Sequence, residues 1–282
     1  MYKAMFFGII ILFGVIISSI ASCDNYPIFI QDQTNHDLYY WNGSVQPDEE
    51  DITTKEESMS IKTLVLPENL KWFSGYNAQF EALEEYIVDE SSPFLRSIDG
   101  VLFTKDMRVL LAYPRGKTCS EYQIPNGVIR IAESAFEGNT HLQDITLSKD
   151  VKWICRSAFS SCSALKKINL NEKLSCIEDR AFEYCRSLKE FNCPENLKII
   201  GYHAFYMSSL NKLTLNDGLV CVMGEAFFTH CFDEAEIFLP ASILYFDRTV
   251  FSADEKITII SASYSDQSIY IMDGVINFIV SP

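Results

Sequence analysis

Several residues in this 282-residue chain have types that could do chemistry, and their spacing decides whether they do. Nucleophilic catalysis needs a Ser or Cys held by a base, but no GxSxG motif occurs here. The segment PRGKT (114–118) resembles the end of a phosphate-binding loop, yet Leu111 stands where such a loop needs a glycine. We therefore predict that the chain is not an enzyme and uses no cofactor. We also expect surface or loop positions for its four histidines, which are scattered along the chain: His36, His141, His203 and His230.

Metal and redox chemistry are equally poorly supported by the spacing. The nine cysteines form no CxxC pair, which argues against zinc-ribbon and thioredoxin-type sites. No HExxH motif occurs, and the acidic run 48–57 lacks the glycine and the ligand spacing of a calcium loop. Cys162 and Cys185 stand at equivalent positions of neighbouring units, described below. We expect both to be reduced and buried as small apolar groups, with a disulfide as the alternative if their Cα atoms lie within about 7 Å.

Composition narrows the possible partners. The net charge of −15 argues against general binding to DNA or RNA, whose phosphates select a basic surface. With 48% apolar and 13% aromatic residues, the chain can bury a sizeable core. The charge is uneven, because residues 48–57 hold six acids against Lys55, whereas residues 151–212 hold ten Lys or Arg against six acids. We interpret both segments as solvated surface.

The N-terminus has the layout of a secretory signal. Lys3 is followed by an apolar run over 5–17 and then by small residues. The run is short for a membrane span, which needs about 20 apolar residues, so residues 1–22 are predicted to be a signal peptide, with an uncleaved signal anchor as the alternative. The letters IASC at 20–23 also resemble a bacterial lipoprotein box, in which Cys23 would carry lipid. Membrane attachment is expected only through one of these features.

A repeat of 23 residues organises the rest of the chain. Its landmark is a phenylalanine, usually preceded by alanine, and these anchors recur at a constant interval of 23 residues: Phe136, Phe159, Phe182, Phe205, Phe228 and Phe251. Self-similarity at such a period is the signature of a solenoid, in which each unit is one coil. A single coil cannot bury its own apolar stripe, so stacked coils share a continuous core. We expect the anchors to form a buried aromatic column.

Each unit also contains a short segment in which apolar and polar residues alternate, as in DITL, KINL, EFNC and KLTL. Period two over so short a run predicts a strand with one buried face. Polar turns (SKD, NEK, PEN, NDG) follow these strands, and we expect each coil to return through a helical or 3₁₀ turn at its AF pair. The predicted fold class is therefore an α/β repeat with short parallel strands on one face of a solenoid.

These motifs resemble a known family. The layout AF-x-x-C/N-x-x-L-x-x-I-x-L, followed by I-x-x-x-A-F, is similar to the BspA-like (Treponema-type) leucine-rich-repeat family. Residues 86–117 look like the β-hairpin insertion typical of it, with IDGVLF and VLLAYP as the paired strands. The resemblance covers about 61–260 and implies a cell-surface or secreted protein of a bacterium or parasitic protist that binds host extracellular proteins.

We accordingly divide the chain into a signal segment (1–22), an acidic polar leader (23–60) and a leucine-rich-repeat solenoid (61–282). Within the solenoid, the hairpin insertion lies near 89–117 and a C-terminal cap occupies 261–282. One glycosylation sequon, at Asn42, falls in the leader.

The surface expected to bind a ligand is the outward face of the strands. By alternation, its candidate residues are Asp144, Thr146, Lys167, Asn169, Glu190, Asn192, Lys212, Thr214, Glu236 and Phe238. We predict an exported, cell-surface protein that binds a protein or glycan ligand, such as host extracellular matrix, through this face. The alternative is an intracellular or membrane-anchored scaffold for protein–protein interaction.

Overall fold

The structure is a computed structural model that describes residues 62–66, 68, 70–71, 73, 80–229, 235–247, 249–251, 257–261 and 276–280. The predicted signal segment and leader, including Cys23 and Asn42, lie outside these residues, as does most of the predicted cap at 261–282. No helix in the described part of the chain is long and apolar enough to cross a membrane.

The described chain opens with five strands that precede the regular coils. Strands β1 (Thr63–Leu66) and β2 (Glu85–Val88) pair in parallel. Strands β3 (Leu95–Ile98), β4 (Val101–Thr104) and β5 (Val109–Ala112) then pair antiparallel. The two residues between β3 and β4 are Asp99 and Gly100, both with positive φ (49° and 76°), as a tight hairpin turn requires. The antiparallel pair expected within 86–117 is thus β4 and β5, and β3 adds a third strand.

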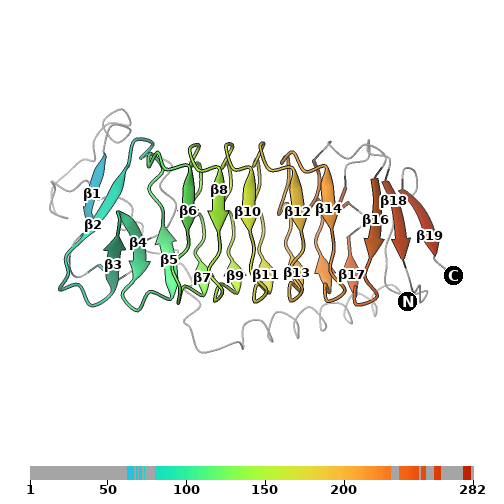
Figure 1. Ribbon diagram of the computed structural model, residues 1–282, viewed down its shortest axis with the longest axis horizontal. Coiled ribbons are helices and arrows are strands. Elements are labelled where there is room, and N and C mark those ends of the chain that lie inside the picture. The colour runs from blue at the N-terminus through green and yellow to red at the C-terminus, as the bar shows by residue number, and fades with distance from the viewer. Residues whose placement is uncertain are drawn as a thin grey trace, which may run out of the picture. The chain divides into compact units, whose positions relative to one another are not determined.

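From β6 to β17, each coil contributes two strands, one to each side of the core (Figure 1). We call the first side the front and the second the back. The front strands are β6 (Glu121–Gln123), β8 (Asp144–Thr146), β10 (Lys167–Asn169), β12 (Glu190–Asn192), β14 (Lys212–Thr214), β16 (Ala235–Leu239), β18 (Ile257–Ser261) and β19 (Ile276–Val280). The back strands are β7 (Arg130–Ile131), β9 (Trp153–Ile154), β11 (Cys176–Ile177), β13 (Ile199–Ile200), β15 (Cys221–Val222) and β17 (Tyr245–Phe246). The prediction of one strand per coil missed the back strands.

The helical part of the α/β prediction is wrong, because no helix occurs among the described residues. The AF segments form turns whose amides bond to the next coil: Phe136 N–H donates to Ala158 O (2.7 Å) and Phe159 N–H to Ala181 O (2.8 Å). A helix needs those amides for carbonyls four residues back in its own segment. Bonding between coils therefore replaces the helix.

The aromatic column is present and runs through the core. Consecutive ring centroids of Phe136, Phe159, Phe182 and Phe205 lie 4.8, 5.1 and 5.1 Å apart, and all four side chains are fully buried. This spacing matches the separation of neighbouring strands, so each coil adds one ring to the stack.

One anchor was assigned wrongly. Phe227, not Phe228, continues the column, with its ring 5.3 Å from Phe205 and 5.9 Å from Phe251. The coil after Phe205 is one residue shorter than those before it, so the inward-facing anchor comes one residue earlier than the 23-residue interval predicts. Phe228 instead stacks on Tyr206 at 5.5 Å, beside the column.

The equivalent cysteines of adjacent coils are reduced and buried, as expected. The Cys162 thiol lies 3.1 Å from the carbonyl oxygen of Phe136, and the Cys185 thiol lies 3.1 Å from that of Phe159. Burial raises the pKa of both thiols well above the ordinary value, so each stays protonated and donates to the preceding coil. The disulfide alternative is not adopted.

Candidate binding surface

The two sides of the solenoid differ in continuity. The back sheet is unbroken: nine strands pair in the order β17-β15-β13-β11-β9-β7-β5-β4-β3. The front strands form three separate sheets, β6-β8-β10, β12-β14 and β16-β18-β19. No ladder joins β10 to β12 or β14 to β16 within the described chain, and the wider separation of β10 and β12 is visible in Figure 1.

The corner after each front strand accounts for these breaks. In the coil of β10, the Asn171 amide donates to the carbonyl oxygens of Ser148 (2.6 Å) and Val151 (3.0 Å) in the preceding coil. The Asn216 amide in the coil of β14 does the same, to the carbonyls of Pro194 and Leu197. Each asparagine therefore ties its corner to the corner before it.

Proline occupies the same corner position wherever a front sheet begins. Pro125 follows β6, Pro194 follows β12 and Pro240 follows β16. Each proline comes directly after an inward-facing residue at, or one position past, the end of its strand. A proline side chain has no hydrogen-bond donor, so the residue next to the strand makes no bond of the Asn171 kind. The corners after β12 and β16 are tied to the preceding coil only two residues further on, where the Asn196 amide donates to Glu172 O (2.8 Å) and the Ser242 hydroxyl donates to Leu219 O (2.6 Å). We interpret the missing donor as the reason that β12 and β16 separate from the strands before them.

The predicted face residues lie where alternation placed them. Ile145, Ile168, Phe191, Leu213 and Ile237 point to the core cluster, so their neighbours point outward. On β12 and β14, the outward residues Glu190, Asn192, Lys212 and Thr214 are all exposed, as is Lys167 on β10, whereas Asp144, Thr146 and Asn169 are half-buried. Phe238 is 64% exposed on β16. Glu236 belongs to the same strand, but its side chain lies outside the described residues.

Contacts along this face are few and weak. Lys212 Nζ lies 3.3 Å from Glu190 Oε2 on the neighbouring strand, and the Asn169 amide donates to Thr146 Oγ1 at 3.0 Å. Exposed ion pairs of this kind contribute little to stability. The face is therefore a polar surface whose side chains are available to a ligand.

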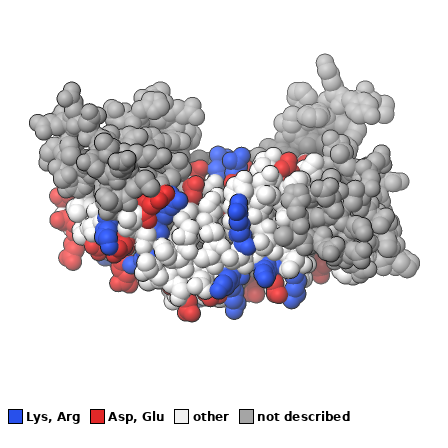
Figure 2. Space-filling view, turned by 90° about the horizontal axis from the view of Figure 1, so that it is seen from above, with Lys and Arg blue, Asp and Glu red and all other residues white. Residues whose placement is uncertain are grey.

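Charge is distributed unevenly over the solenoid. Viewed from above the coils, Lys and Arg side chains stand over the middle coils, while acidic side chains gather toward the hairpin end (Figure 2). Five basic side chains of the segment 151–212 line the gap between β10 and β12: Lys166, Lys167, Arg186, Lys189 and Lys198.

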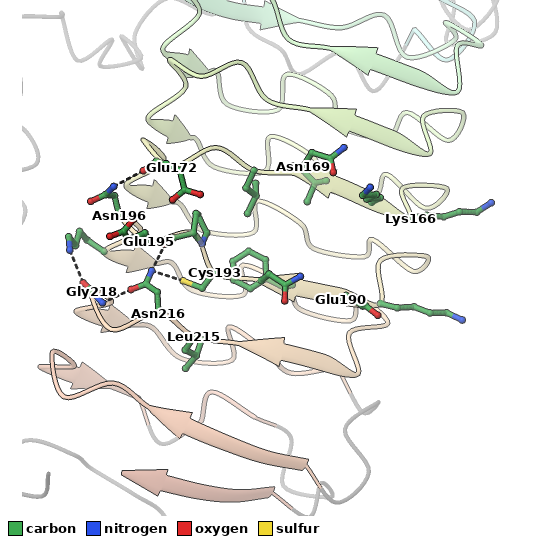
Figure 3. Close-up of a pocket in the computed structure, with 18 of the residues that line it drawn as sticks. Lys166, Asn169, Glu172, Glu190, Cys193, Glu195, Asn196, Leu215, Asn216 and Gly218 are labelled. Carbon is green, nitrogen blue, oxygen red and sulfur yellow. Dashed lines mark hydrogen bonds between the residues drawn. The ribbon is translucent and has the colours of Figure 1, made fainter. Parts of the chain in front are cut away.

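A groove occupies the gap between β10 and β12 and encloses about 1620 Å³ (Figure 3). Its lining includes both strands, the segments that lead into them, the corners that follow them and the corner after β14 (215–218). Sequence reasoning did not identify this groove. The signal was nonetheless present, since the turns SKD, NEK and NDG begin with a hydrogen-bonding side chain and PEN begins with proline.

The histidines that the structure describes do not form a catalytic centre. His203 is half-buried between the rings of Tyr202 (3.8 Å) and Tyr206 (4.3 Å), with Nε2 2.8 Å from Glu225 Oε2. Its side chain is packed, but the residue lies in a turn, and His141 is exposed, so both fit the surface or loop positions expected. Among the described residues, no group of three or more His, Cys, Asp or Glu is arranged to hold a metal ion.

Comparisons with known proteins agree with the repeat and the fold. A family model described as BspA type leucine rich repeat region matches residues 115–232 and 209–272. No curated protein matches the chain significantly.

Solved structures of bacterial proteins match most of the chain. The pneumococcal vaccine antigen PcpA is 25% identical, with a TM-score of 0.60, over 71% of this chain and 51% of that one. A leucine-rich repeat protein from Eubacterium ventriosum is 22% identical, with a TM-score of 0.60, over 74% and 57%. A leucine-rich cell surface protein from Faecalibacterium prausnitzii is 23% identical, with a TM-score of 0.50, over 73% and 49%. This chain thus spans about half the length of the solved structures it matches.

Proposed function

This chain belongs to the BspA-type leucine-rich-repeat family, and from that premise we propose that it is an exported, cell-surface binding protein. Its ligand is a protein or a glycan, with host extracellular matrix as the first class to test, and it binds through the outward face of the front strands. The family match and the leucine-rich-repeat fold support a binding scaffold. The vaccine-antigen description of PcpA, the relative at 25% identity, supports a surface location.

The observation that carries the proposal is the exposed polar row over β10, β12 and β14. Lys167, Glu190 and Lys212 project from adjacent coils and take part in at most one surface ion pair. Because these side chains add little to stability, their contribution is available for recognition. Parallel strands in register also present them at a regular spacing across a broad surface, which suits a macromolecular ligand.

A charge-reversal experiment tests the face. The full chain is assayed for binding to immobilised animal extracellular-matrix proteins and to a panel of immobilised glycans. We expect the double variant Lys167→Glu/Lys212→Glu to lose most of the binding that the unmodified chain shows. The matched control Lys105→Glu/Lys152→Glu makes the same change in net charge away from the front strands and should bind normally. Equal loss in both variants, or in neither, would exclude the front face as the binding surface.

Location is tested separately. We expect mass spectrometry of the native protein to find a new N-terminus near residue 23, and intact cells to expose the chain to added protease. An uncleaved N-terminus together with protection from protease would favour the intracellular scaffold instead.

A further inference from the structure

The gap between β10 and β12 leaves backbone groups of two strands facing each other without partners. On β10, the N–H and C=O of residues 167 and 169 point to β8, since Lys167 N–H bonds to Gln143 O and Asn169 O accepts from Leu147 N–H. Those of Ile168 must then point the opposite way, toward β12. By the same register, the backbone groups of Glu190 and Asn192 point away from β14 and toward β10. None of them pairs with another described residue.

The gap is confined to the front. Behind it, the rings of Phe159 and Phe182 stack at 5.1 Å, and β11 pairs with β13. The Ser187 hydroxyl donates to Ser163 O at 2.7 Å where the two coils approach their front strands. At the corner, the Asn196 amide donates to Glu172 O at 2.8 Å. The coils are thus held together around the gap, and the open edges belong to a preformed groove rather than to a loosened repeat.

The floor of the groove is apolar. Ile168 and Leu170 are half-buried, whereas the equivalent Ile145 and Leu147 one coil earlier are buried. The half-buried Cys193 lines the other wall, beside Phe191, which is itself buried. An apolar side chain entering from the front would restore the burial that Ile168 and Leu170 lack.

The two ends of the groove carry opposite charge, as Figure 3 shows for Lys166 on one side and for Glu172 and Glu195 on the other. The end at which the strands start is lined by Lys166, Lys167, Arg186 and Lys189. Glu190 also lies there, but it is paired with Lys212.

The corner end is lined by Glu172, Glu195 and Asp217, together with Lys198, whose Nζ donates to Gly218 O at 3.0 Å. None of these three acids, and none of Lys166, Lys167 or Lys189, forms an ion pair with another described residue. The uncompensated charge is therefore positive at the start of the strands and negative at the corner.

We propose that this groove binds an extended peptide segment of a partner protein, which adds as a strand between β10 and β12. Its backbone bonds to the free edges, an apolar side chain covers Ile168 and Leu170, a carboxylate meets the lysine end and a basic side chain meets the corner acids. Strand addition to unpaired edges is an established way for proteins to bind peptides, and charge complementarity sets its direction. The inference rests on the proposed role of the front face in protein binding and narrows it to one segment of that face.

A peptide fits the groove better than a glycan does. The unpaired groups on both walls alternate donor and acceptor in strand geometry, which a peptide backbone matches and a sugar ring does not. Glycan sites also rely on exposed aromatic rings as stacking platforms, whereas Phe191, the ring in this groove, is buried. Glycan binding is therefore kept as an outcome of the test and not as part of the proposal.

The test uses the full chain and capped synthetic peptides of about nine residues, a length suited to one strand. Each peptide alternates Val and Thr, with two Glu at one end and two Lys at the other, in both sequence directions; an uncharged version serves as the control. We expect one of the two charged peptides to bind at least about tenfold more tightly than the uncharged one. Hydrogen exchange should show new protection at the amides of Ile168, Glu190 and Asn192, which binding through side chains alone would not produce.

Two variants separate the gap from the rest of the face. Pro194→Asn supplies the corner amide present at Asn171 and Asn216, so it should close the gap, protect those amides without peptide and weaken peptide binding about tenfold or more. Lys167→Glu/Lys189→Glu, which leaves Pro194 in place, should also weaken binding, and a peptide with Lys in place of its Glu should restore it. The second variant decides the matter if Pro194→Asn fails to fold.

Binding of neither peptide, unchanged binding in both variants, or binding of an oligosaccharide in place of the peptides would overturn the inference. The proposed function is judged independently by the matrix-protein assay. Loss of matrix binding in Lys167→Glu/Lys212→Glu with no peptide binding would retain the front face and reject the gap. If Lys167→Glu/Lys212→Glu keeps full matrix binding and the full chain binds no peptide, both the front face and the gap are rejected as binding sites.

Discussion

The back and the front of the solenoid are built from the same coils, yet one side is a continuous sheet and the other is divided into three. The back strands are two residues long, and each pairs with the next without interruption from β7 to β17. The front strands are longer but separate at β10/β12 and β14/β16. Strand length therefore does not decide continuity in this molecule.

The difference lies in what holds neighbouring coils at each side. Each back strand leads almost directly into an AF turn, whose amides bond from coil to coil, whereas six or seven residues separate an AF turn from the next front strand. The front strands depend more on the corner residue that follows them, which is Asn171 or Asn216 where pairing holds and Pro194 or Pro240 where it fails. We infer that the side chains that hydrogen-bond between coils, rather than the length of the strands, determine where neighbouring front strands separate.

The largest expected effect comes from the core that both sheets share. Phe182→Ala removes a fully buried ring between two others in the column, and we expect a loss of about 3–5 kcal/mol in the free energy of unfolding because a cavity remains. Denaturant unfolding measures it. Phe238→Ala, at an exposed ring on the front, is the control and should change stability by less than about 0.5 kcal/mol. Similar losses in both would contradict the buried column.

The next effect tests the corner. Asn171→Ala removes the two hydrogen bonds to Ser148 O and Val151 O, and we expect it to cost about 1–3 kcal/mol because those carbonyls lose their partner. Hydrogen exchange should accelerate at the front amides of Lys167 and Asn169 but not at Ile177 on the back. Equal acceleration on both sides would show that the corner does not act on the front alone.

A smaller effect is expected from buried thiols at alkaline pH. Burial raises the pKa of Cys221 on the back, and that of Cys193 in the groove, to about 11. The pKa of a thiol in the unfolded chain is about 8.5. The unfolded state therefore releases protons first, so stability is full below that pH and falls as pH rises toward 11. Unfolding under reducing conditions from pH 7 to 10 measures the decline.

Tyrosines and lysines titrate in the same pH range as the thiols. The variants Cys221→Ala and Cys193→Ala therefore isolate the contribution of each thiol to the loss of stability with pH. Each variant should lose stability less steeply with pH than the parent chain does. If the slopes are identical, the thiols do not contribute to the pH dependence.

The smallest effect is expected at the outward charges of the front. Glu190→Gln breaks the exposed pair with Lys212 and should cost only a few tenths of a kcal/mol. Thermal unfolding at low and high salt measures it, and the difference from the parent should vanish at high salt because the pair is screened. A loss above about 1 kcal/mol would mean that this face is structural rather than available for binding.

Much of the fold was predictable from particular residues. The 23-residue interval placed Phe136, Phe159, Phe182 and Phe205 in one column, and alternation placed Ile168 and Phe191 inward with Lys167 and Glu190 outward. These predictions succeeded because burial of an apolar stripe repeats with the coil.

Other features were not predictable by the same reasoning. A two-residue strand such as β9 or β11 is too short to show a period, so the back sheet left no pattern. The coil after Phe205 is one residue short in the sequence as well, but the letters AFF fit either Phe227 or Phe228 as the anchor, and only the ring contacts distinguish them. The AF segments resemble helical turns in sequence, but the amides of their phenylalanines bond to residues 21 to 23 positions further along the chain.

The sequence by itself determined the period, the core column and the polar front, because each follows from which side chains avoid water within a single repeat. Only the tertiary structure decided that the coils from β6 to β17 have two strands each, that the front divides after β10 and β14, and that a groove of opposite end charges lies at the first division. Those features depend on hydrogen bonds between coils, whose partners stand about one repeat apart and whose place in the corner differs from coil to coil.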